Sequence, residues 1–355
     1  MILVGDALEK LREIPDATIQ TCVTSPPYWG LRDYGTAQWD GGDPVCTHEP
    51  PQEWIQRNFN AHSAFGNGVA TQSAAASIRW YGTDGMCPCG ARRTDRQIGI
   101  EKTPEVYVGK LVNVFREVMR VLKDDGTLWL NLGDSYNGSG QSGGTNSISG
   151  KGKSQPGGGI LKDVPNLKPK NLVGIPWRVA FALQADGWYL RSDIIWHKPN
   201  PMPESVVDRP TKSHEYIFLL TKSAKYYYDA DAIKENSIWA HSNPRADGSG
   251  VSYGQKNEQG LFKRNRRDVW SITPQPFSGA HFATFPPEIP ELCIKAGSSP
   301  GDTVLDPFAG SGTTLIVAKK LFRKFIGVEL NPKYAHELIS PRLADTDPLF
   351  SEAAK

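Results

Sequence analysis

The segment Thr24-Ser25-Pro26-Pro27-Tyr28-Trp29-Gly30 combines a hydroxyl, a rigid turn and aromatic rings directly after an apolar run. That run predicts a buried strand, so these groups would emerge at the carboxyl edge of a sheet, where open α/β sheets bind ligands. Successive prolines preorganise the Ser25 hydroxyl and a backbone carbonyl as acceptors for both hydrogens of an amine. Tyr28 could stack on the ring that carries this amine. The segment therefore predicts chemistry at an exocyclic amine whose lone pair is delocalised into a ring.

A second segment, from Asp302 to Thr314, predicts a strand, a tight glycine turn and a helix. Glycines let the backbone approach a ligand closely, and a helix N-terminus presents free amides and the positive end of its dipole. The next predicted strand ends at Glu329, about 20 residues after the turn, where a nucleoside-binding βαβ unit places a carboxylate on the ribose diol. The two features together predict a nucleoside site.

Other nucleotide sites fit this segment less well. A phosphate-binding loop needs a lysine before its Ser/Thr, and Gly312-Thr313-Thr314 has none. A dinucleotide fingerprint needs a third glycine beyond Gly310 and Gly312. A structural strand-to-helix turn with a surface Glu329 is the remaining alternative.

Both segments resemble the motifs of the DNA amino-methyltransferases, which are Ser/Asp/Asn-Pro-Pro-aromatic and Asp-Pro-Phe-x-Gly-Ser-Gly-Thr. The catalytic motif precedes the cofactor motif here, an order that resembles the beta-type permutation of that family, and the resemblance covers nearly the whole chain. It implies an α/β fold with a Rossmann-like, doubly wound, mostly parallel sheet of seven strands, circularly permuted and interrupted by an irregular insertion. It also implies methyl transfer from S-adenosyl-L-methionine to a base flipped out of double-stranded DNA.

The resemblance implies roles for individual residues. Gly5-Asp6-Ala7-Leu8 is similar to the motif near the cofactor adenine, and the stretch from His281 to Pro286 is similar to the motif that flanks the methionine moiety. We expect the catalytic residues to be Ser25, Pro26, Pro27 and Tyr28. We expect the cofactor to contact Asp6, Thr24, Phe285, Asp306, Pro307, Phe308, Gly310, Gly312, Thr313, Glu329 and Asn331.

A serine at position 25 resembles the cytosine-N4 branch of the family, so cytosine N4 is the expected target. Adenine-N6 enzymes share the motif order and remain the alternative, because both bases present an amine beside a ring nitrogen. A catalytically inactive DNA-binding module is a further alternative, which the two intact motifs disfavour. Methylation of RNA or of a small molecule would use the same amine chemistry.

By the same resemblance, the stretches from Asp193 to Pro203 and from Lys212 to Ile217 would border the target-base pocket. Alternatively, Trp196 lies in the core, Lys198 faces water, and His197 and His214 make ordinary hydrogen bonds, since a methylated amine sheds its proton without a strong base. A basic run near residue 265 could neutralise phosphates, although such runs are usually solvated faces. The expected DNA contacts are Trp29, Trp196, Lys198, His214, Lys263, Arg264, Arg266 and Arg267.

Two short turns, Cys46-Thr47-His48 and Cys87-Pro88-Cys89-Gly90, offer four soft ligands, the number that a structural tetrahedral zinc ion needs. Each pair has one intervening residue, fewer than the commoner two to four. Free thiols in a loop-rich segment are the alternative. A closed four-ligand site would leave no position for water, so a zinc ion here would be structural.

Composition narrows the class of protein. The chain has 355 residues, a formal net charge of +2 and five cysteines, an odd number that argues against a disulfide framework. The charge is too small to indicate nucleic-acid binding by itself. Charged residues interrupt the N-terminal segment, which argues against a signal peptide, so we expect a cytoplasmic location. Family analogy adds a possible homodimer and a possible cognate restriction endonuclease as partners.

Alternating strand and helix patterns position these motifs. Strands are expected at residues 19–24, 127–131, 189–196, 216–220, 303–305 and 325–328. Helices are expected at 104–122, ending at a stop at 123–126, and after Pro176, Pro286 and Gly312. We divide the chain into a catalytic-motif part (1–32), an insertion (33–98), a continued methyltransferase domain (99–221, with a flexible loop at 138–170), a target-recognition segment (222–275) and a cofactor-binding part (276–355).

Overall fold

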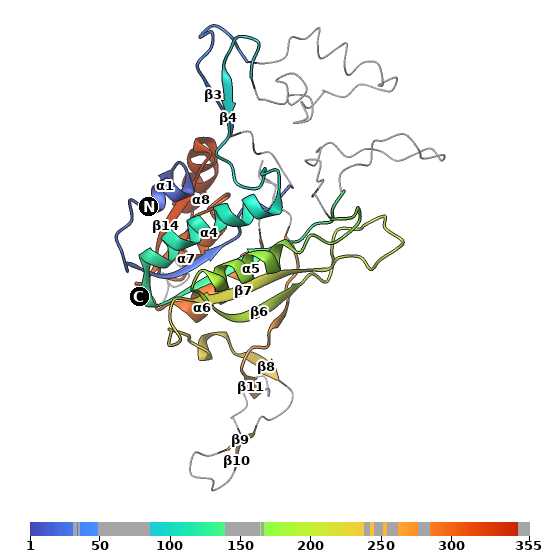
Figure 1. The fold of residues 1–355 in the computed structure, drawn as a ribbon. Helices are drawn as coiled ribbons and strands as arrows, with labels where there is room; N and C mark the ends of the chain where they lie inside the picture. The colour runs from blue at the N-terminus through green and yellow to red at the C-terminus, as the bar shows by residue number, and fades with distance from the viewer. Residues whose placement is uncertain are drawn as a thin grey trace. The chain divides into compact units, whose positions relative to one another are not determined.

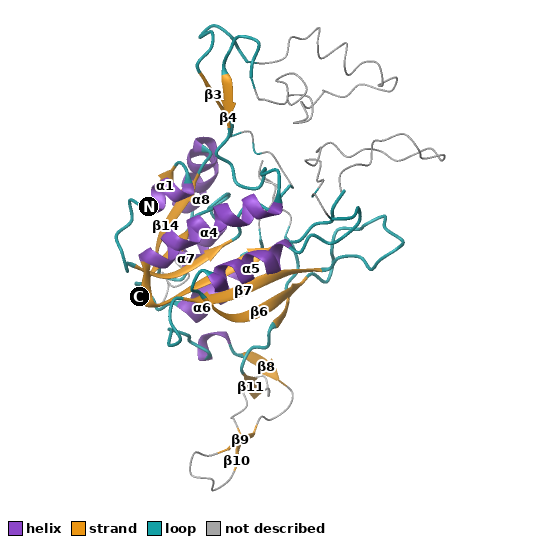
Figure 2. Ribbon diagram, viewed as in Figure 1, coloured by secondary structure: helices purple, strands orange, loops and turns teal. Residues whose placement is uncertain are grey.

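The computed structural model describes residues 1–30, 34, 36–48, 86–138, 164, 167–237, 242–244, 251–253, 262–275 and 285–346. Contacts between these residues group the chain into two compact units. Unit 1 comprises Met1–Pro26, Val112–Gly133 and Val179–Lys355, and unit 2 comprises Pro27–Leu111 and Asp134–Arg178. Unit 1 carries the main sheet, and unit 2 carries a small two-stranded sheet (Figures 1 and 2).

The main sheet contains eight strands among the described residues. Neighbouring strands are parallel throughout, except that β7 is antiparallel to both β5 and β6. The expected mostly parallel α/β fold is therefore confirmed. In spatial order the strands are β1 (Ile2–Val4), β14 (Lys324–Glu329), β13 (Thr303–Asp306), β2 (Ile19–Thr24), β5 (Leu122–Leu132), β7 (His214–Thr221), β6 (Tyr189–His197) and β12 (Val269–Ser271).

Helices cover both faces of this sheet. All six residues of β2 are buried, which requires a cover on each side of the strand. Val23, Trp129 and Val304 share one core cluster with residues of α6 and α7, while α4 and α5 lie on the other face (Figure 1). The helices are α1 (Ala7–Leu11), α4 (Pro104–Val121), α5 (Ile175–Ala185), α6 (Glu288–Gly297), α7 (Thr313–Lys320) and α8 (Ser340–Ala344), which follows a π-helical turn at Tyr334–Ile339.

The expected sheet of seven strands is wrong by one strand. Val269–Ser271, which the sequence placed in the recognition segment, pairs parallel with β6 and forms the edge strand β12. Its anchor is Trp270, which is 3% exposed and packs in the main core cluster. A strand of three residues has too short a pattern to be recognised, and the burial of one large side chain holds it in place.

The other expected strands and helices are present with small changes at their ends. The helix expected at 104–122 ends at Val121, and β5 begins at Leu122, so residues 123–126 belong to a strand and are not a helix stop. Leu122 pairs with Ile19 of β2, which draws the chain into the sheet at once. Almost all of the loop expected at 138–170 lies outside the described residues.

The described residues also form three two-stranded sheets that are not paired with the main one. They are β3 (Gln38–Asp40) with β4 (Arg92–Thr94), β8 (Glu235–Ser237) with β11 (Phe262–Arg264), and β9 (Ser242–Pro244) with β10 (Val251–Tyr253), all antiparallel. A short 3-10 turn at Asp231–Ile233 precedes β8. Within the described part of the chain, no helix combines the length and the apolar character that a membrane span requires.

Candidate functional site

Parallel pairing brings the carboxyl ends of β1, β14, β13 and β2 to one edge of the sheet. The register pairs Val4 of β1 with Glu329 of β14, and the amide of Gly5 donates to the backbone carbonyl of Glu329 at 2.9 Å. The next strand along, β13, ends at Asp306, and β2 ends at Thr24. Both motifs that the sequence singled out for chemistry therefore begin at this edge.

Glu329 is a buried carboxylate held by the turns on either side of it. Its Oε2 accepts from the amide of Gly310 at 2.8 Å, and its Oε1 accepts from the amide of Asn331 at 2.8 Å. Burial raises the pKa of Glu329 to about 7, against the opposing effect of these backbone hydrogen bonds. Glu329 is 9% exposed, so it is not the surface residue that the structural alternative assumed.

Asp306 connects the two motifs. Its Oδ1 accepts from the Thr24 hydroxyl at 2.6 Å and from the amide of Phe308 at 3.1 Å. Burial raises the pKa of Asp306 to about 6, and hydrogen bonds from Thr24 and Thr314 act in the opposite direction. The last residue of the strand before Ser25 is thus bonded to the first residue of the glycine turn.

The glycine turn needs its glycines. Gly310 and Gly312 have φ values of 54° and 79°, in the left-handed region that side chains disfavour. A Cβ on Gly312 would also lie 2.7 Å from Cγ2 of Ile339. Helix α7 begins at Thr313 directly after this turn, so its first amides lie at the sheet edge.

These features fit an adenosine-type cofactor. A buried carboxylate at the end of β14 can accept hydroxyl protons of a ribose, and a glycine turn lets a ligand approach the backbone. Asp6 is placed beside them by Gly5 and also caps α1, because its Oδ1 accepts from the amide of Glu9 at 3.1 Å. Of the remaining expected cofactor residues, Pro307 and Thr313 are buried and Phe308 and Asn331 are partly exposed.

Two expected cofactor residues have other contacts in this structure. Thr24 is 1% exposed and directs its hydroxyl at Asp306, so it acts through that carboxylate. Phe285 packs against the main core cluster. The rest of the expected methionine motif, residues 281–284, lies outside the described residues.

The catalytic motif is divided along the chain between the two units, after Pro26. In unit 1, Ser25 is partly exposed and Pro26 is buried at the end of β2. In unit 2, Tyr28 is partly exposed, whereas Trp29 is 3% exposed and donates through Nε1 to the carbonyl of Glu101 at 2.9 Å. Trp29 is therefore an anchor for this turn.

A polar network lies at the same edge, across β5, β7 and β6. The Lys198 ammonium pairs with Oε1 of Glu215 and lies 4.3 Å from the ring centroid of Trp196. Nδ2 of Asn131 donates to Oε2 of Glu215 at 3.3 Å and to the carbonyl of Tyr216 at 3.0 Å. Sequence reasoning gave no role to Asn131, which ends an expected strand, and included Glu215 only within the stretch 212–217 expected to border the base pocket.

The expected base-pocket residues have defined partners. Trp196 is 4% exposed and donates to the carbonyl of Ile272 at 2.9 Å, which supports the alternative that it is a core residue. The pKa of His214 is lowered, chiefly by burial and then by Lys212. His197 Nδ1 lies 3.0 Å from the hydroxyl of Ser271.

The arginines of the basic run donate hydrogen bonds to nearby acceptors. Arg264 and Arg267 both donate through Nε to Oε1 of Glu235, at 2.6 and 2.7 Å. Arg266 donates to the carbonyl of Ile233 at 2.9 Å. Lys263 lies on β11 with its side chain exposed. The run is thus a partly neutralised surface of β8 and β11.

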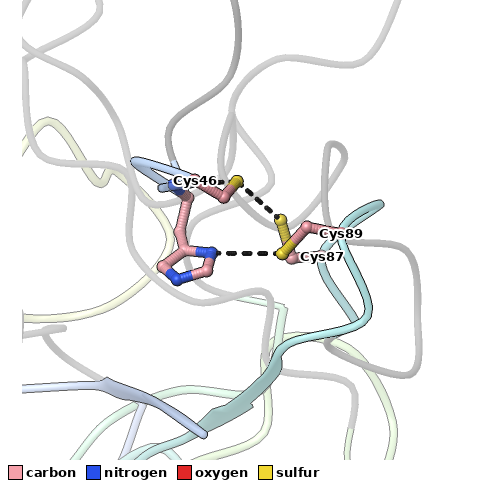
Figure 3. A group of neighbouring side chains, drawn as sticks. Cys46, Cys87 and Cys89 are labelled. Atoms are coloured by element: carbon pink, nitrogen blue, oxygen red, sulfur yellow. Dashed lines mark hydrogen bonds between the residues drawn. The ribbon is translucent and has the colours of Figure 1, made fainter. Parts of the chain in front are cut away.

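Four potential metal ligands converge beside β3 and β4 in unit 2. Figure 3 shows the side chains of Cys46, Cys87 and Cys89 turned toward one another. His48 is the fourth member of this group. Their ligand atoms all lie within 4.8 Å of one another. The Cys46 and Cys87 sulfurs are 3.8 Å apart, and Cys89 Sγ lies 3.5 Å from Nδ1 of His48.

These distances fit a tetrahedral zinc ion and not a disulfide. A disulfide needs its sulfurs about 2.05 Å apart. Two thiolates at about 2.3 Å from zinc in tetrahedral geometry lie about 3.8 Å apart, and a thiolate and an imidazole nitrogen lie about 3.6 Å apart. Trp39 stacks on His48 with ring centroids 4.9 Å apart, which fixes the orientation of the imidazole.

Known proteins resemble this chain over almost its whole length. Residues 19–340 match a family described as DNA methylase, N6_N4_Mtase. The Type II methyltransferase M.SmaI of Serratia marcescens is 43% identical over 335 residues, which cover 94% of this chain and 87% of that protein. The Type II methyltransferase M.Cfr9I of Citrobacter freundii is 42% identical over 333 residues, covering 93% and 83%.

Solved structures support the fold. The cytosine-N4-specific PvuII DNA methyltransferase superposes with a TM-score of 0.55 at 17% identity, covering 98% of this chain and 86% of that chain. A putative DNA modification methylase from Thermus thermophilus, complexed with S-adenosyl-L-methionine, superposes with a TM-score of 0.53 at 24% identity, covering 98% and 94%.

Proposed function

The chain belongs to the N6/N4 DNA methylase family, and from that premise we propose that it methylates the N4 amine of cytosine in double-stranded DNA. Membership makes it an S-adenosylmethionine-dependent DNA amino-methyltransferase. The choice of cytosine is the finer part of the proposal. It rests on Ser25 of the Ser-Pro-Pro-Tyr motif, which resembles the cytosine-N4 branch.

One observation carries the proposed site. The hydrogen bond of 2.6 Å from Thr24 to Asp306 joins the strand that delivers Ser25 to the turn that would hold the cofactor. A methyl donor and an amine acceptor must meet within near-contact distance for transfer to occur. Adjacent parallel strands that end in the two motifs supply this proximity.

The cofactor, when bound, supplies an electrophilic sulfonium methyl group. Glu329 is proposed to accept the ribose hydroxyls, while Gly310, Gly312 and the amides that begin α7 line the approach. Ser25 and the Pro26 carbonyl are proposed to accept the two amine hydrogens, which localises the nitrogen lone pair for attack. The nitrogen forms its bond to the methyl carbon as the sulfur bond breaks, and the extra proton then leaves to solvent.

The target base must leave the duplex before this chemistry can occur, because the amine is inaccessible within the stack. Tyr28 is proposed to stack on the flipped base. Lys198 and Glu215, at the ends of β6 and β7, are proposed to border the pocket. Lys263, which is exposed on β11, is the member of the basic run best placed to reach a phosphate.

The names of the similar proteins support a proposal about the partners of this protein. Relatives named Type II methyltransferases support a role in restriction-modification, with a cognate endonuclease as the proposed partner. A homodimer and a cytoplasmic location stay predictions.

A zinc ion bound by Cys46, His48, Cys87 and Cys89 completes the proposed cofactors. The donor set and the spacing of the ligand atoms support it. Four protein ligands close the coordination sphere, so this ion would stabilise the protein and take no part in methyl transfer.

The decisive experiment is to incubate the purified protein with labelled S-adenosylmethionine and mixed-sequence duplex DNA, then to identify methylated nucleosides by mass spectrometry. We expect N4-methylcytosine. N6-methyladenine would keep the mechanism and overturn the choice of base, and label found only in a parallel RNA reaction would overturn the choice of substrate.

A further inference from the structure

Unit 2 contains two chain segments that contact each other between the Cys/His cluster and the Tyr28 turn. At the cluster end, β3 and β4 pair with Gln38 opposite Thr94. Farther along, the Thr36 hydroxyl donates to Oδ1 of Asp95 at 2.9 Å, and the amide of Tyr34 donates to Oε1 of Gln97 at 2.7 Å. Hydrogen bonds that involve side chains therefore join described residues of the two segments beyond the two strands. We call the described residues of 28–40 and 92–101 the brace.

The other end of the brace holds the Tyr28 turn. The amide of Gly30 donates to the carbonyl of Gly99 at 2.7 Å, and Nε1 of Trp29 donates to the carbonyl of Glu101 at 2.9 Å. Gly99 has a φ of 105°, and a Cβ on it would lie 3.0 Å from the carbonyl oxygen of Tyr28. The two segments thus touch at the turn itself.

Glu101 and Tyr107 make further hydrogen bonds to the two segments near the Tyr28 turn. The Glu101 carboxylate is 8% exposed, accepts from the amide of Gly99 at 2.8 Å and pairs with Lys110 on α4 at 2.8 Å. The Tyr107 hydroxyl, also on α4, donates to the carbonyl of Pro27 at 2.9 Å. Leaving a buried carboxylate or a buried phenol without a hydrogen-bond partner costs free energy. The Glu101 and Tyr107 bonds therefore favour one backbone position for Gly99 and one for Pro27.

The Cys/His cluster lies at the end of the brace that is farther along the chain from Tyr28. The brace segments are joined through residues 41–91, and a metal bound to both Cys-x-His and Cys-x-Cys would clamp them together at the end away from Tyr28. Without the metal, the strand pairing between the described parts of the two segments consists of β3 and β4, with three residues each. The stability of such a short two-stranded sheet is marginal by itself.

We propose that zinc at the cluster acts through the brace to position Tyr28 for capture of the flipped base, with Glu101 and Tyr107 as positioning residues. The roles given to Tyr28 and to the zinc ion rest on the proposed function, whereas the contacts that link the cluster to the turn do not. Metal loss then impairs the DNA step and leaves the cofactor step intact.

The test compares the zinc-loaded protein, the protein after chelation, and the variants Cys89→Ser, Tyr107→Phe and Asp40→Asn. Zinc is counted by mass spectrometry, S-adenosylmethionine affinity by calorimetry, and backbone protection of residues 27–30 and 97–101 by hydrogen exchange. The kcat and the KM for DNA are measured on a duplex selected by the methylation assay. Asp40→Asn changes an exposed side chain on β3 that is not one of the four potential ligands, and it is the matched control.

We expect about one zinc ion per chain in the wild type, Tyr107→Phe and Asp40→Asn, and loss of zinc in Cys89→Ser. Chelation and Cys89→Ser should raise exchange in both peptides and lower kcat/KM for DNA about tenfold or more, with cofactor affinity within about twofold. Tyr107→Phe should keep zinc yet lower kcat/KM for DNA, because it disturbs the Tyr28 turn without changing the metal ligands. This variant also keeps the proposal testable if Cys89→Ser does not fold.

Unchanged exchange in the two peptides after complete zinc removal would overturn the proposal, as would wild-type kcat/KM in a zinc-free protein. Absence of zinc from freshly purified protein, with none taken up on addition, would overturn it as well. Failure of the proposed function is distinct: zinc and the exchange response would be present, but no duplex would be methylated.

Discussion

The hydroxyl of Thr24 donates to the Asp306 carboxylate over 2.6 Å, and this contact spans 282 positions of the sequence. Both side chains are almost wholly buried, at 1% and 2% exposed. A buried carboxylate strongly prefers to keep its donors, so the bond fixes how the catalytic strand and the cofactor turn lie beside each other.

Replacing Thr24 by Val should remove the hydroxyl that donates to Asp306 and keep the shape of the side chain. We expect a loss of about 1–3 kcal/mol in the free energy of unfolding. The loss should be larger at pH 8 than at pH 5, because the pKa of Asp306 is about 6 and only the ionised carboxylate needs the donor strongly. Urea unfolding at both pH values measures it, with Thr24→Ser as the control that keeps the hydroxyl. An equal loss at the two pH values would contradict this account.

The raised pKa of Glu329, about 7 through burial, predicts a pH dependence of cofactor binding. The carboxylate is the form that accepts ribose hydroxyls, so affinity for S-adenosylmethionine should fall by up to about tenfold per pH unit below that pKa. Calorimetry between pH 5.5 and 8.5, about one and a half units on each side of the pKa, tests this. Glu329→Gln should bind weakly with a flat profile. A flat profile in the wild type would contradict the assignment.

The same shift affects stability with a definite sign. A carboxyl whose folded pKa lies above its unfolded value binds more protons when folded, so its contribution to stability falls as pH rises from about 4.5 to about 7. The cofactor-free protein should therefore lose less stability across this window in Glu329→Gln than in the wild type. Thermal unfolding at several pH values would show the difference.

Gly312→Ala should disable the cofactor turn. The residue has a φ of 79°, and the new Cβ would meet Ile339 at 2.7 Å. Gly301→Ala is a matched control, because Gly301 has a similar φ of 88° but no atom within 4 Å of the added Cβ. Both variants should lose about 1 kcal/mol of stability from backbone strain. Only Gly312→Ala should weaken S-adenosylmethionine binding, and equal weakening in both would refute the steric argument.

Ser25→Ala and Tyr28→Ala should separate chemistry from cofactor binding. Each is expected to keep S-adenosylmethionine affinity within about twofold while turnover falls by about 10²-fold, the scale of one preorganised donor or acceptor. Tyr28→Phe keeps the ring that stacks and should retain most activity. Normal turnover in both alanine variants would remove the roles proposed for these residues.

The Lys198 and Glu215 pair predicts a non-additive effect. Lys198→Met removes the cation that pairs with the Glu215 carboxylate, which is 15% exposed and also accepts from Asn131. It should therefore cost more stability than Lys198→Met combined with Glu215→Gln. A double-mutant cycle of unfolding free energies measures the coupling, and strict additivity would show that the pair does not interact. If the pair borders the base pocket, KM for DNA should change while cofactor affinity does not.

Prediction from sequence succeeded where a pattern is long or local. The helix at 104–121 and the strand at 19–24 carry enough periodicity to be recognised, and the Ser-Pro-Pro-Tyr and Asp-Pro-Phe-x-Gly-Ser-Gly motifs are contiguous. The four potential metal ligands could be singled out because each pair lies within one short turn. Segments of three residues, such as β12, carry no periodicity that could distinguish them from a loop.

The sequence by itself determined the family, the type of sheet and the residues of both motifs, because those depend on side-chain identity and local spacing. Only the tertiary structure decided which of these residues face each other. It assigned the hydroxyl of Thr24 to Asp306, buried Trp29 against Glu101 and paired Lys198 with Glu215. The physical reason is that a buried polar group takes whichever partner the packing of distant strands brings within hydrogen-bond reach, and sequence spacing carries no record of that choice.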